Sequence, residues 1–157
     1  GLVNAGYRAI ETLRLEKGYR AWGSDIGPDH TPVEAGLLWA CKMKSGLGFL
    51  GRQALEAQVA NGVRKRLACF TVDDPQVILL GRETIYRDGQ RVGWLSSGGF
   101  GHSLGLPIGM GYVRHPEGVT EAFVLSGAYE LEVASERVAA KVSLSPLYDP
   151  TNSRIKA

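Results

Sequence analysis

An Asp-Gly pair at positions 88 and 89, set between two runs of alternating apolar and polar residues, constrains the fold of this chain more than any other feature. Asp-Gly readily adopts the positive φ angles that a two-residue hairpin turn needs, so two antiparallel strands are predicted over residues 83–95. Further short β-type segments lie at 67–72, 108–113, 123–125, 129–133 and 138–144. Short strands separated by turn residues predict a small all-β barrel or sandwich after residue 62.

The first part of the chain carries helical periodicity instead. Apolar residues recur every three or four positions between Val3 and Arg14, which predicts an amphipathic helix. Asn4 is a candidate cap for its start, and Gly18 is expected to end it. The apolar run 37–41 is expected to form a strand, and a second, short helix is predicted over residues 52–59.

Composition limits the class of protein. At 157 residues and 44% hydrophobic content, the chain is long enough for one ordinary core or two small ones. Its net charge is +2 and the charges are interspersed, which argues against a nucleic-acid-binding face but is compatible with a small anionic ligand. No apolar run approaches the length of a membrane helix, which is about 18 residues or more. Because the chain begins with Gly1, it is expected to be a fragment of a longer protein.

The two cysteines predict neither a metal site nor a disulfide framework. Cys41 and Cys69 lie in apolar runs without any Cys-x-x-Cys or Cys/His ligand spacing, as expected of two buried thiols in a reducing compartment. The histidines at positions 30, 102 and 115 are isolated, so we expect no metal cluster and no nucleophile-base pair.

Two glycine-rich stretches invite different interpretations. Residues 46–51 match G-x-G-x-x-G, with Asp73 at a distance typical of a dinucleotide-binding unit. That unit needs further alternating strands and helices, whereas the following sequence is β-type throughout, so we expect these glycines to form a turn that presents Arg52. Ser96–Gly105 is expected to be a bend rather than the interior of a strand.

Residues 4–25 concentrate the candidates for ligand binding. The carboxylate of Glu16 could accept two parallel hydrogen bonds from a heterocycle with an amino-pyrimidinone edge, or it could be a solvated helix-end group paired with Lys17 or Arg20. The aromatic rings of residues 7, 19 and 22 could flank such a heterocycle, or they could belong to the core. Lys42, Lys44 and Arg52 could hold a carboxylate tail or form a solvated charged face.

Several motifs in order resemble one family. They are Ala5-Gly6-Tyr7, Leu13-Arg-Leu-Glu-Lys-Gly-Tyr19, Trp22-Gly-x-Asp25, Phe49-Leu-Gly-Arg-x-Ala-Leu55 and Gly89-x-x-Val-Gly-x-x-Ser-Ser-Gly98. Together they resemble the aminomethyltransferase family, which includes the glycine-cleavage T-protein, and are most similar to the C-terminal regions of the sarcosine and dimethylglycine dehydrogenases. The resemblance implies that residues 1–62 are an α+β remnant, the C-terminal part of the family's folate-binding domain. It implies that residues 63–157 are its small C-terminal β-barrel domain.

The resemblance also implies site residues. Glu16 would bind the pterin and Tyr7 would contribute to the folate pocket. Arg14 and Leu15, which belong to the same motif as Glu16, are further candidates for the folate site, as are Tyr19 and Trp22. Either Lys44 or Arg52 would hold the folate tail. A tyrosine contact of the T-protein's C-terminal tail falls near Ser153, so this chain departs from the family there.

The function implied by the resemblance is acceptance of a one-carbon unit by tetrahydrofolate. In such dehydrogenases an iminium derived from an N-methyl amine passes from an FAD domain to the folate module, where 5,10-methylenetetrahydrofolate forms. The FAD domain and the catalytic aspartate are expected upstream, so this chain is expected to be inactive alone, in a bacterial cytoplasm or a mitochondrial matrix. The alternatives are a regulatory module like the pyruvate dehydrogenase phosphatase regulatory subunit, or a fragment of a stand-alone aminomethyltransferase.

Overall fold

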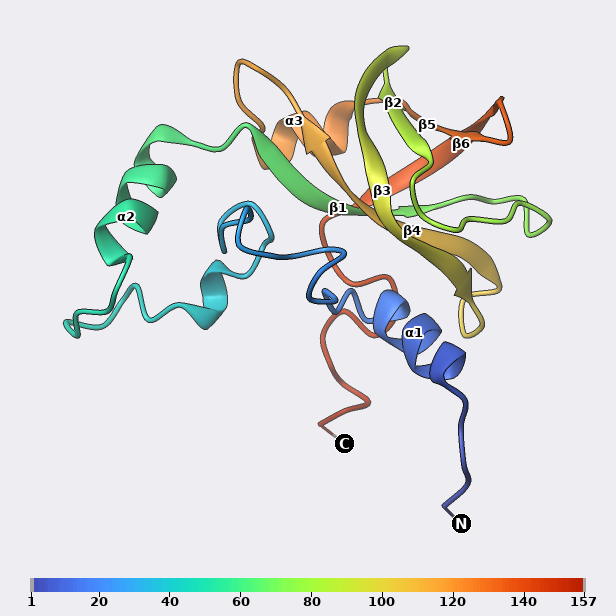
Figure 1. Ribbon diagram of the computed structural model, residues 1–157, viewed down its shortest axis with the longest axis horizontal. Helices are drawn as coiled ribbons and strands as arrows, with labels where there is room; N and C mark the ends of the chain where they lie inside the picture. The colour runs from blue at the N-terminus through green and yellow to red at the C-terminus, as the bar shows by residue number, and fades with distance from the viewer. Residues whose placement is uncertain (1, 157) are drawn as a thin grey trace.

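A computed structural model describes residues 2–156, and its centre is a closed barrel of six antiparallel strands (Figure 1). Around the barrel the strands follow the order β1-β4-β3-β2-β5-β6, and β1 pairs with both β4 and β6 to close it. The strands are β1 (Lys65–Thr71), β2 (Thr84–Arg87), β3 (Gln90–Gly101), β4 (Leu106–Arg114), β5 (Tyr129–Val133) and β6 (Glu136–Ser143). The predicted small all-β barrel is confirmed.

Turn chemistry sets the register of the barrel's hairpins. Asp88 and Gly89 have φ angles of 50° and 78° and join β2 to β3, as predicted from the Asp-Gly pair. Ala134 and Ser135 join β5 to β6 in the same way, with φ angles of 50° and 69°. Non-glycine residues tolerate this backbone region only at a cost, so strand pairing on both sides must hold the second turn in place.

The barrel has a core on each side of β1 and β4. Phe70, Ile85, Leu95 and Leu131 are fully buried inside it. A second cluster lies on the outside of the wall, under helix α1 (Tyr7–Glu16). Its members are Leu15, Leu67, Cys69, Ile108, Met110 and Tyr112. Because alternate residues of a strand point to opposite faces, β1 and β4 must be apolar on both faces, and β1 reads as a nearly continuous apolar run.

The predicted bend over Ser96–Gly105 is wrong for its first part, because β3 continues to Gly101 and only residues 102–105 form the turn. The glycines have a packing role. A Cβ at Gly98 would lie 2.6 Å from the backbone nitrogen of Gly81, and one at Gly99 would lie 3.1 Å from Leu15 Cδ1. Glycine in this strand therefore lets a loop and helix α1 pack directly on the backbone.

Three other local predictions are wrong. Residues 37–41 form no strand; they contain the 3-10 helix η1 (Leu38–Ala40), since no neighbouring strand pairs with them in the described structure. Residues 123–125 lie in helix α3 (Glu121–Ser126), which Thr120 caps by accepting the amide of Phe123 at 3.0 Å. Helix α1 begins after Gly6 without a side-chain cap, so Asn4 does not cap it.

An arm holding η1 and α2 (Arg52–Asn61) extends away from the barrel (Figure 1). The predicted second helix is confirmed, and Gly62 ends it with a φ angle of 80°. Gly51 precedes it with a φ angle of 88°, so the G-x-G-x-x-G stretch ends in a turn, and among residues 2–156 no parallel sheet lies beside it. Within residues 2–156 no helix has the length and hydropathy to cross a membrane.

Candidate functional site

The last turn of α1 places Glu16 against the turn that joins β3 to β4. The side chain is only 2% exposed. Glu16 Oε1 accepts a hydrogen bond from the backbone amide of Ser103 at 2.6 Å, and Oε2 accepts one from the Ser103 hydroxyl at 2.9 Å. A Cβ at Gly101 would lie 3.3 Å from Oε1, so glycine at the end of β3 leaves room for the carboxylate. The solvated, helix-end alternative for Glu16 is therefore excluded.

A second buried carboxylate, Asp25, connects the segment after α1 to the barrel. It is completely buried and accepts hydrogen bonds from the amide of Ala21 at 3.0 Å and from the hydroxyl of Ser97 at 2.8 Å. The hydroxyl of Ser96 and the guanidinium of Arg14 also donate to it. The carbonyl of Asp25 accepts from the hydroxyl of Tyr112. Each donor satisfies part of a charge that would otherwise be costly to bury.

Arg14 links helix α1 to the barrel through the hydrogen bonds around Asp25. Its guanidinium contacts both Glu11 and Asp25 and donates to the Ser97 hydroxyl at 2.8 Å. Burial lowers the pKa of Arg14, but the neighbouring carboxylates outweigh that effect and raise it overall. Leu15, the next residue, packs into the apolar cluster under the helix. Arg14 and Leu15 thus fix the helix on the barrel, which in turn fixes Glu16.

The three aromatic candidates lie on the surface. Tyr7 is 77% exposed, Trp22 is 75% exposed and Tyr19 is 55% exposed, so the alternative that they belong to the core is excluded. Tyr7 lies at the start of α1, whereas Tyr19 and Trp22 follow its end. All three rings are therefore open to solvent in the described structure.

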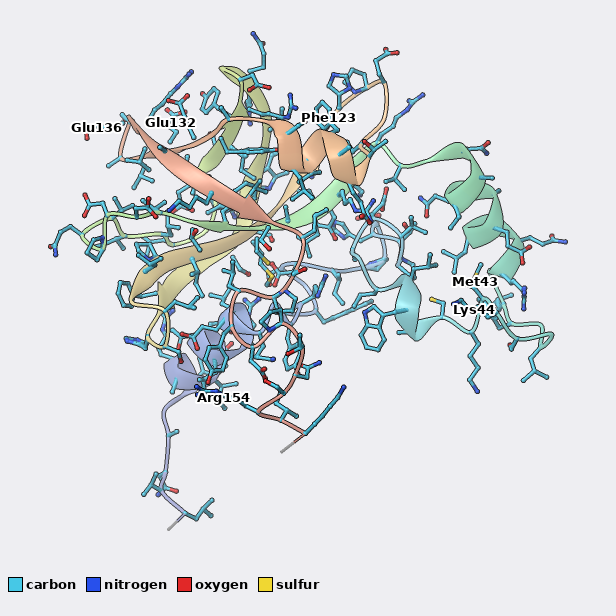
Figure 2. All side chains as sticks on the ribbon, turned by 180° about the vertical axis from the view of Figure 1, so that it is seen from behind. Met43, Lys44, Phe123, Glu132, Glu136 and Arg154 are labelled. Carbon is cyan, nitrogen blue, oxygen red and sulfur yellow. The ribbon has the colours of Figure 1, made fainter. Side chains whose placement is uncertain are left out.

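The two basic candidates differ in their surroundings. The guanidinium of Arg52 donates to the carbonyls of Met43, Ser45 and Leu47 at 2.6–2.8 Å and pairs with Glu56. Arg52 therefore closes the turn before α2 through its own guanidinium. Lys44 is exposed on the same arm, which Figure 2 shows beside Met43.

The C-terminal tail folds back on the end of α1. The amide of Tyr148 donates to the carbonyl of Glu16 at 2.9 Å, and Lys17 donates to the side chain of Asn152 at 2.8 Å and to the carbonyl of Asp149. Ser153 bonds only to Asp149 within the tail. A cavity of about 380 Å³ lies between tail, helix end and arm. Its lining includes Lys17, Tyr19, Arg20, Trp39, Pro146 and Asn152.

The sequence did not reveal the partners of the two carboxylates. The one local feature that singles out Asp25 is its place in the Trp-Gly-x-Asp motif. Ser96 and Ser97 lie in the stretch predicted to be a bend, although paired hydroxyls beside glycines can also indicate polar groups at a close helix contact. Ser103 carried no signal, because its role depends on a helix 87 positions away.

The described residues, 2–156, contain no group of three or more His, Cys, Asp or Glu side chains arranged to hold a metal ion. Both cysteines are thiols, and burial raises the pKa of Cys69 to about 11. Cys69 is accordingly unreactive near neutral pH, and it serves in the apolar cluster under α1.

Comparisons with known proteins agree with this architecture. Residues 65–149 match the glycine cleavage T-protein C-terminal barrel domain, and residues 1–45 match the GCVT N-terminal domain. The crystal structure of the glycine cleavage system aminomethyltransferase T from Bartonella henselae superimposes with a TM-score of 0.76 at 28% identity. That superposition covers 90% of this chain and 38% of the T-protein.

Curated relatives are more similar in sequence. Mitochondrial sarcosine dehydrogenase from Mus musculus is 49% identical over 99% of this chain, and the chain spans 17% of its length. The mitochondrial pyruvate dehydrogenase phosphatase regulatory subunit of the same species is 37% identical over 94% of the chain, which spans 18% of it. From the barrel, the matched domains and these identities, the chain belongs to the aminomethyltransferase (glycine cleavage T-protein) family.

Proposed function

We propose that this chain is the tetrahydrofolate-binding, C-terminal part of an FAD-dependent dehydrogenase of the sarcosine and dimethylglycine type. The observation that carries the proposal is the buried carboxylate of Glu16, whose two oxygens accept from two different donors. The amide and hydroxyl of Ser103 present that donor pair in the same way as the N–H and amino groups of a pterin would. Recognition of the folate head group by Glu16 then requires the pterin to replace Ser103 at these two oxygens, which are buried in the described structure.

The remaining residues support the other parts of such a ligand. The exposed rings of Tyr7, Tyr19 and Trp22 offer flat apolar surfaces for the pterin and its aromatic linker. For the carboxylate tail we favour Lys44 over Arg52, because the guanidinium of Arg52 is already bound to three backbone carbonyls. Lys44 donates to no other residue within 2–156, and its ammonium group is exposed.

The chemistry would need groups that these residues do not supply. Tetrahydrofolate, when bound, would provide the two nitrogens that take up the methylene of an N-methyl-amine-derived iminium to give 5,10-methylenetetrahydrofolate, and the demethylated amine would leave with the two N–H hydrogens. The residues present do not fit FAD, since the G-x-G-x-x-G stretch ends in the turn before α2 rather than at a parallel sheet. The role of Glu16 and its neighbours would be to bind and orient the folate, and Arg14 with Asp25 would hold the helix that carries Glu16.

A second candidate function is a regulatory module, like the phosphatase regulatory subunit reported above. Glu16 already has both oxygens hydrogen-bonded within the chain and is almost fully covered, which also suits a purely structural carboxylate. Under this alternative the exposed aromatic residues would contact a protein instead of a heterocycle.

Isothermal calorimetry with tetrahydrofolate separates the two functions. It should be done on this chain and on the longer protein that contains it. We expect weak or absent binding by the chain alone, tight binding by the longer protein, and at least about tenfold weaker binding after Glu16→Gln. Glu56→Gln is a matched control, because Glu56 is a half-exposed helix glutamate paired with Arg52.

One result would contradict the pterin role of Glu16, and another would contradict the expectation that the chain alone has an incomplete pocket. Equal folate affinity of the longer protein with and without Glu16→Gln would remove the pterin role from Glu16. Tight binding by the 157-residue chain alone would show that its part of the pocket is sufficient.

A further inference from the structure

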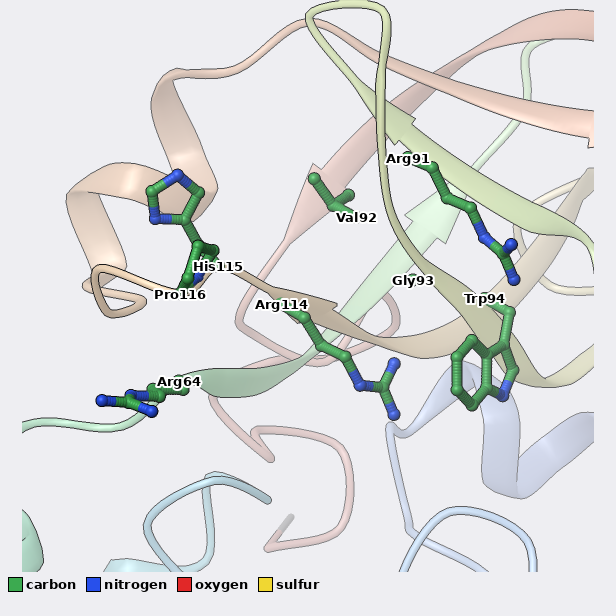
Figure 3. A pocket seen from close by; sticks show the side chains of 8 residues that line it. All are labelled: Arg64, Arg91, Val92, Gly93, Trp94, Arg114, His115 and Pro116. Carbon is green, nitrogen blue, oxygen red and sulfur yellow. The ribbon is translucent and has the colours of Figure 1, made fainter.

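A basic groove lies on the outer wall of the barrel, at the end of β3 remote from Glu16. Figure 3 shows Arg114 of β4 between Arg64 on one side and Arg91 and Trp94 of β3 on the other. The groove is an open, shallow cavity of about 430 Å³. Trp94 is seven positions before Gly101, beside which Glu16 lies, and seven positions span about 23 Å along a strand. We call this cavity the arginine groove.

The basic residues of the arginine groove lack carboxylate partners, unlike many basic residues elsewhere on the barrel. Five other side chains of the barrel are in ion pairs with carboxylates: Lys65 with Glu34, Arg66 with Glu121, Arg87 with Asp88, Arg137 with Glu130 and Lys141 with Asp73. In the described part of the chain, none of Arg64, Arg91 and Arg114 forms such a pair. Arg64, Arg91 and Arg114 thus line one cavity without a carboxylate of residues 2–156 that neutralises them.

Arg114 is the central group of the groove. Its guanidinium lies 4.0 Å from the ring centroid of Trp94, and its only hydrogen bond among residues 2–156 is to the carbonyl of Tyr112 at 3.3 Å. Burial lowers its pKa, and the carboxylate that acts on it, Glu34, already pairs with Lys65. A guanidinium stays charged in proteins, so a partly desolvated one without an acid favours an external anion.

Arg137 of β6, whose guanidinium stacks on Tyr86 of β2, is an arginine with both an aromatic and an acidic partner within the chain. Its guanidinium lies 3.7 Å from the ring centroid of Tyr86, and it also pairs with Glu130 at 3.6 Å. Arg114 has the same aromatic stacking without the acid. The difference is that no side chain of residues 2–156 pairs with Arg114 as Glu130 pairs with Arg137.

The backbone around the groove is fixed by the barrel. Arg91 pairs with Tyr86 across the β2-β3 hairpin, and Arg114 pairs with Lys65 across β1 and β4. The carbonyl of Arg64 accepts the amide of His115 at 3.1 Å. The imidazole of His115 packs on Phe123 of α3 with ring centroids 4.8 Å apart, and Figure 3 shows it directed away from Arg114. The three guanidinium groups, and not the imidazole, are therefore available to a ligand.

We propose that the arginine groove binds a small, multiply charged organic or inorganic anion through Arg91 and Arg114, with Arg64 at its rim. Phosphate and carboxylate groups each present a pair of oxygens that can accept two parallel hydrogen bonds from one guanidinium group. The apolar wall made by Trp94, Val92 and Pro116 can accept the carbon skeleton of such a ligand. This site is separate from the one proposed for folate and does not depend on it.

The test is calorimetric titration of the 157-residue chain with inorganic pyrophosphate, with citrate and with a hexaglutamate peptide at physiological ionic strength. We expect one-to-one binding of pyrophosphate or citrate that weakens about tenfold in Arg91→Gln and in Arg114→Gln. Arg137→Gln removes the same charge from a paired, stacked arginine and should leave the affinity within about twofold. The Arg91 variant keeps the test decisive if loss of stacking on Trp94 unfolds the Arg114 variant.

Each outcome decides the proposal. Preference for pyrophosphate identifies a phosphate ligand, and preference for citrate identifies a carboxylate ligand, and both support it. Equal weakening by Arg137→Gln would show diffuse charge attraction instead of a site. No binding of either small anion, or binding of hexaglutamate alone through the same arginines, would overturn the proposal, the latter in favour of an acidic protein surface.

Discussion

Replacing Asp25 by Asn tests whether the buried charge cluster holds α1 on the barrel. The substitution keeps the shape of the side chain but removes the charge that faces Arg14 and the hydroxyls of Ser96 and Ser97. Removing one partner of a buried ion pair costs about 3–5 kcal/mol, because the other charge is left without compensation. Arg14 retains Glu11, which reduces that cost. We expect the free energy of unfolding to fall by about 3 kcal/mol.

Urea denaturation followed by circular dichroism measures this change, with the slope of the transition checked for two-state behaviour. Asp73→Asn is the matched control, since Asp73 pairs with Lys141 at the surface and both side chains are about 70% exposed. An exposed pair contributes about 0–1 kcal/mol, so the control should be nearly silent. A loss below about 1 kcal/mol in Asp25→Asn would refute the reasoning that the carboxylate anchors Arg14 and the two serines.

Further predictions concern packing, capping and pH. Gly98→Ala should destabilise the chain by about 1–3 kcal/mol in urea titrations, because its Cβ would lie 2.6 Å from a backbone nitrogen, whereas Gly46→Ala, with nothing within 4 Å, should change stability little. Thr120→Ala should cost about 1 kcal/mol by removing the cap of α3, and an unchanged transition would contradict the cap. Between pH 9 and 11 the folded state keeps the Cys69 proton that the unfolded chain loses, so the free energy of unfolding should fall by about 2–3 kcal/mol as pH rises. Cys69→Ala should flatten that fall, and an identical pH profile would rule the thiol out as its cause.

Local turn and strand chemistry could be read from the sequence. The Asp88-Gly89 turn specifies its own φ angles, and the strand predicted over residues 129–133 coincides with β5. The second half of β3 could not be predicted, because its glycines are required by the approach of α1 and the 79–81 loop, which are distant in sequence. The cap of α3 was visible as Thr120-Glu121, but a stretch of three apolar residues fits a strand equally well.

The candidate site was only partly accessible to the same reasoning. Glu16 could be singled out from its motif, whereas its burial follows from contact with Ser103, 87 positions away. Asp25 lay inside a quoted motif, yet nothing local shows that Ser96, 71 positions away, donates to it. The choice between Arg52 and Lys44 depended on which carbonyls a turn brings to the guanidinium, and residue spacing does not specify that.

Closure of the barrel by β1 has a consequence for the order of folding. β1 pairs with β6 through Cys69 and Ser143, which are 74 positions apart in the chain, and with β4 through Cys69 and Met110. Forming such distant pairs requires a large loss of chain entropy before any contact energy is gained, so the closing step is expected to be slow. During synthesis β1 must wait with one edge unpaired until residue 143 has left the ribosome, and in that interval the nascent chain is most exposed to aggregation.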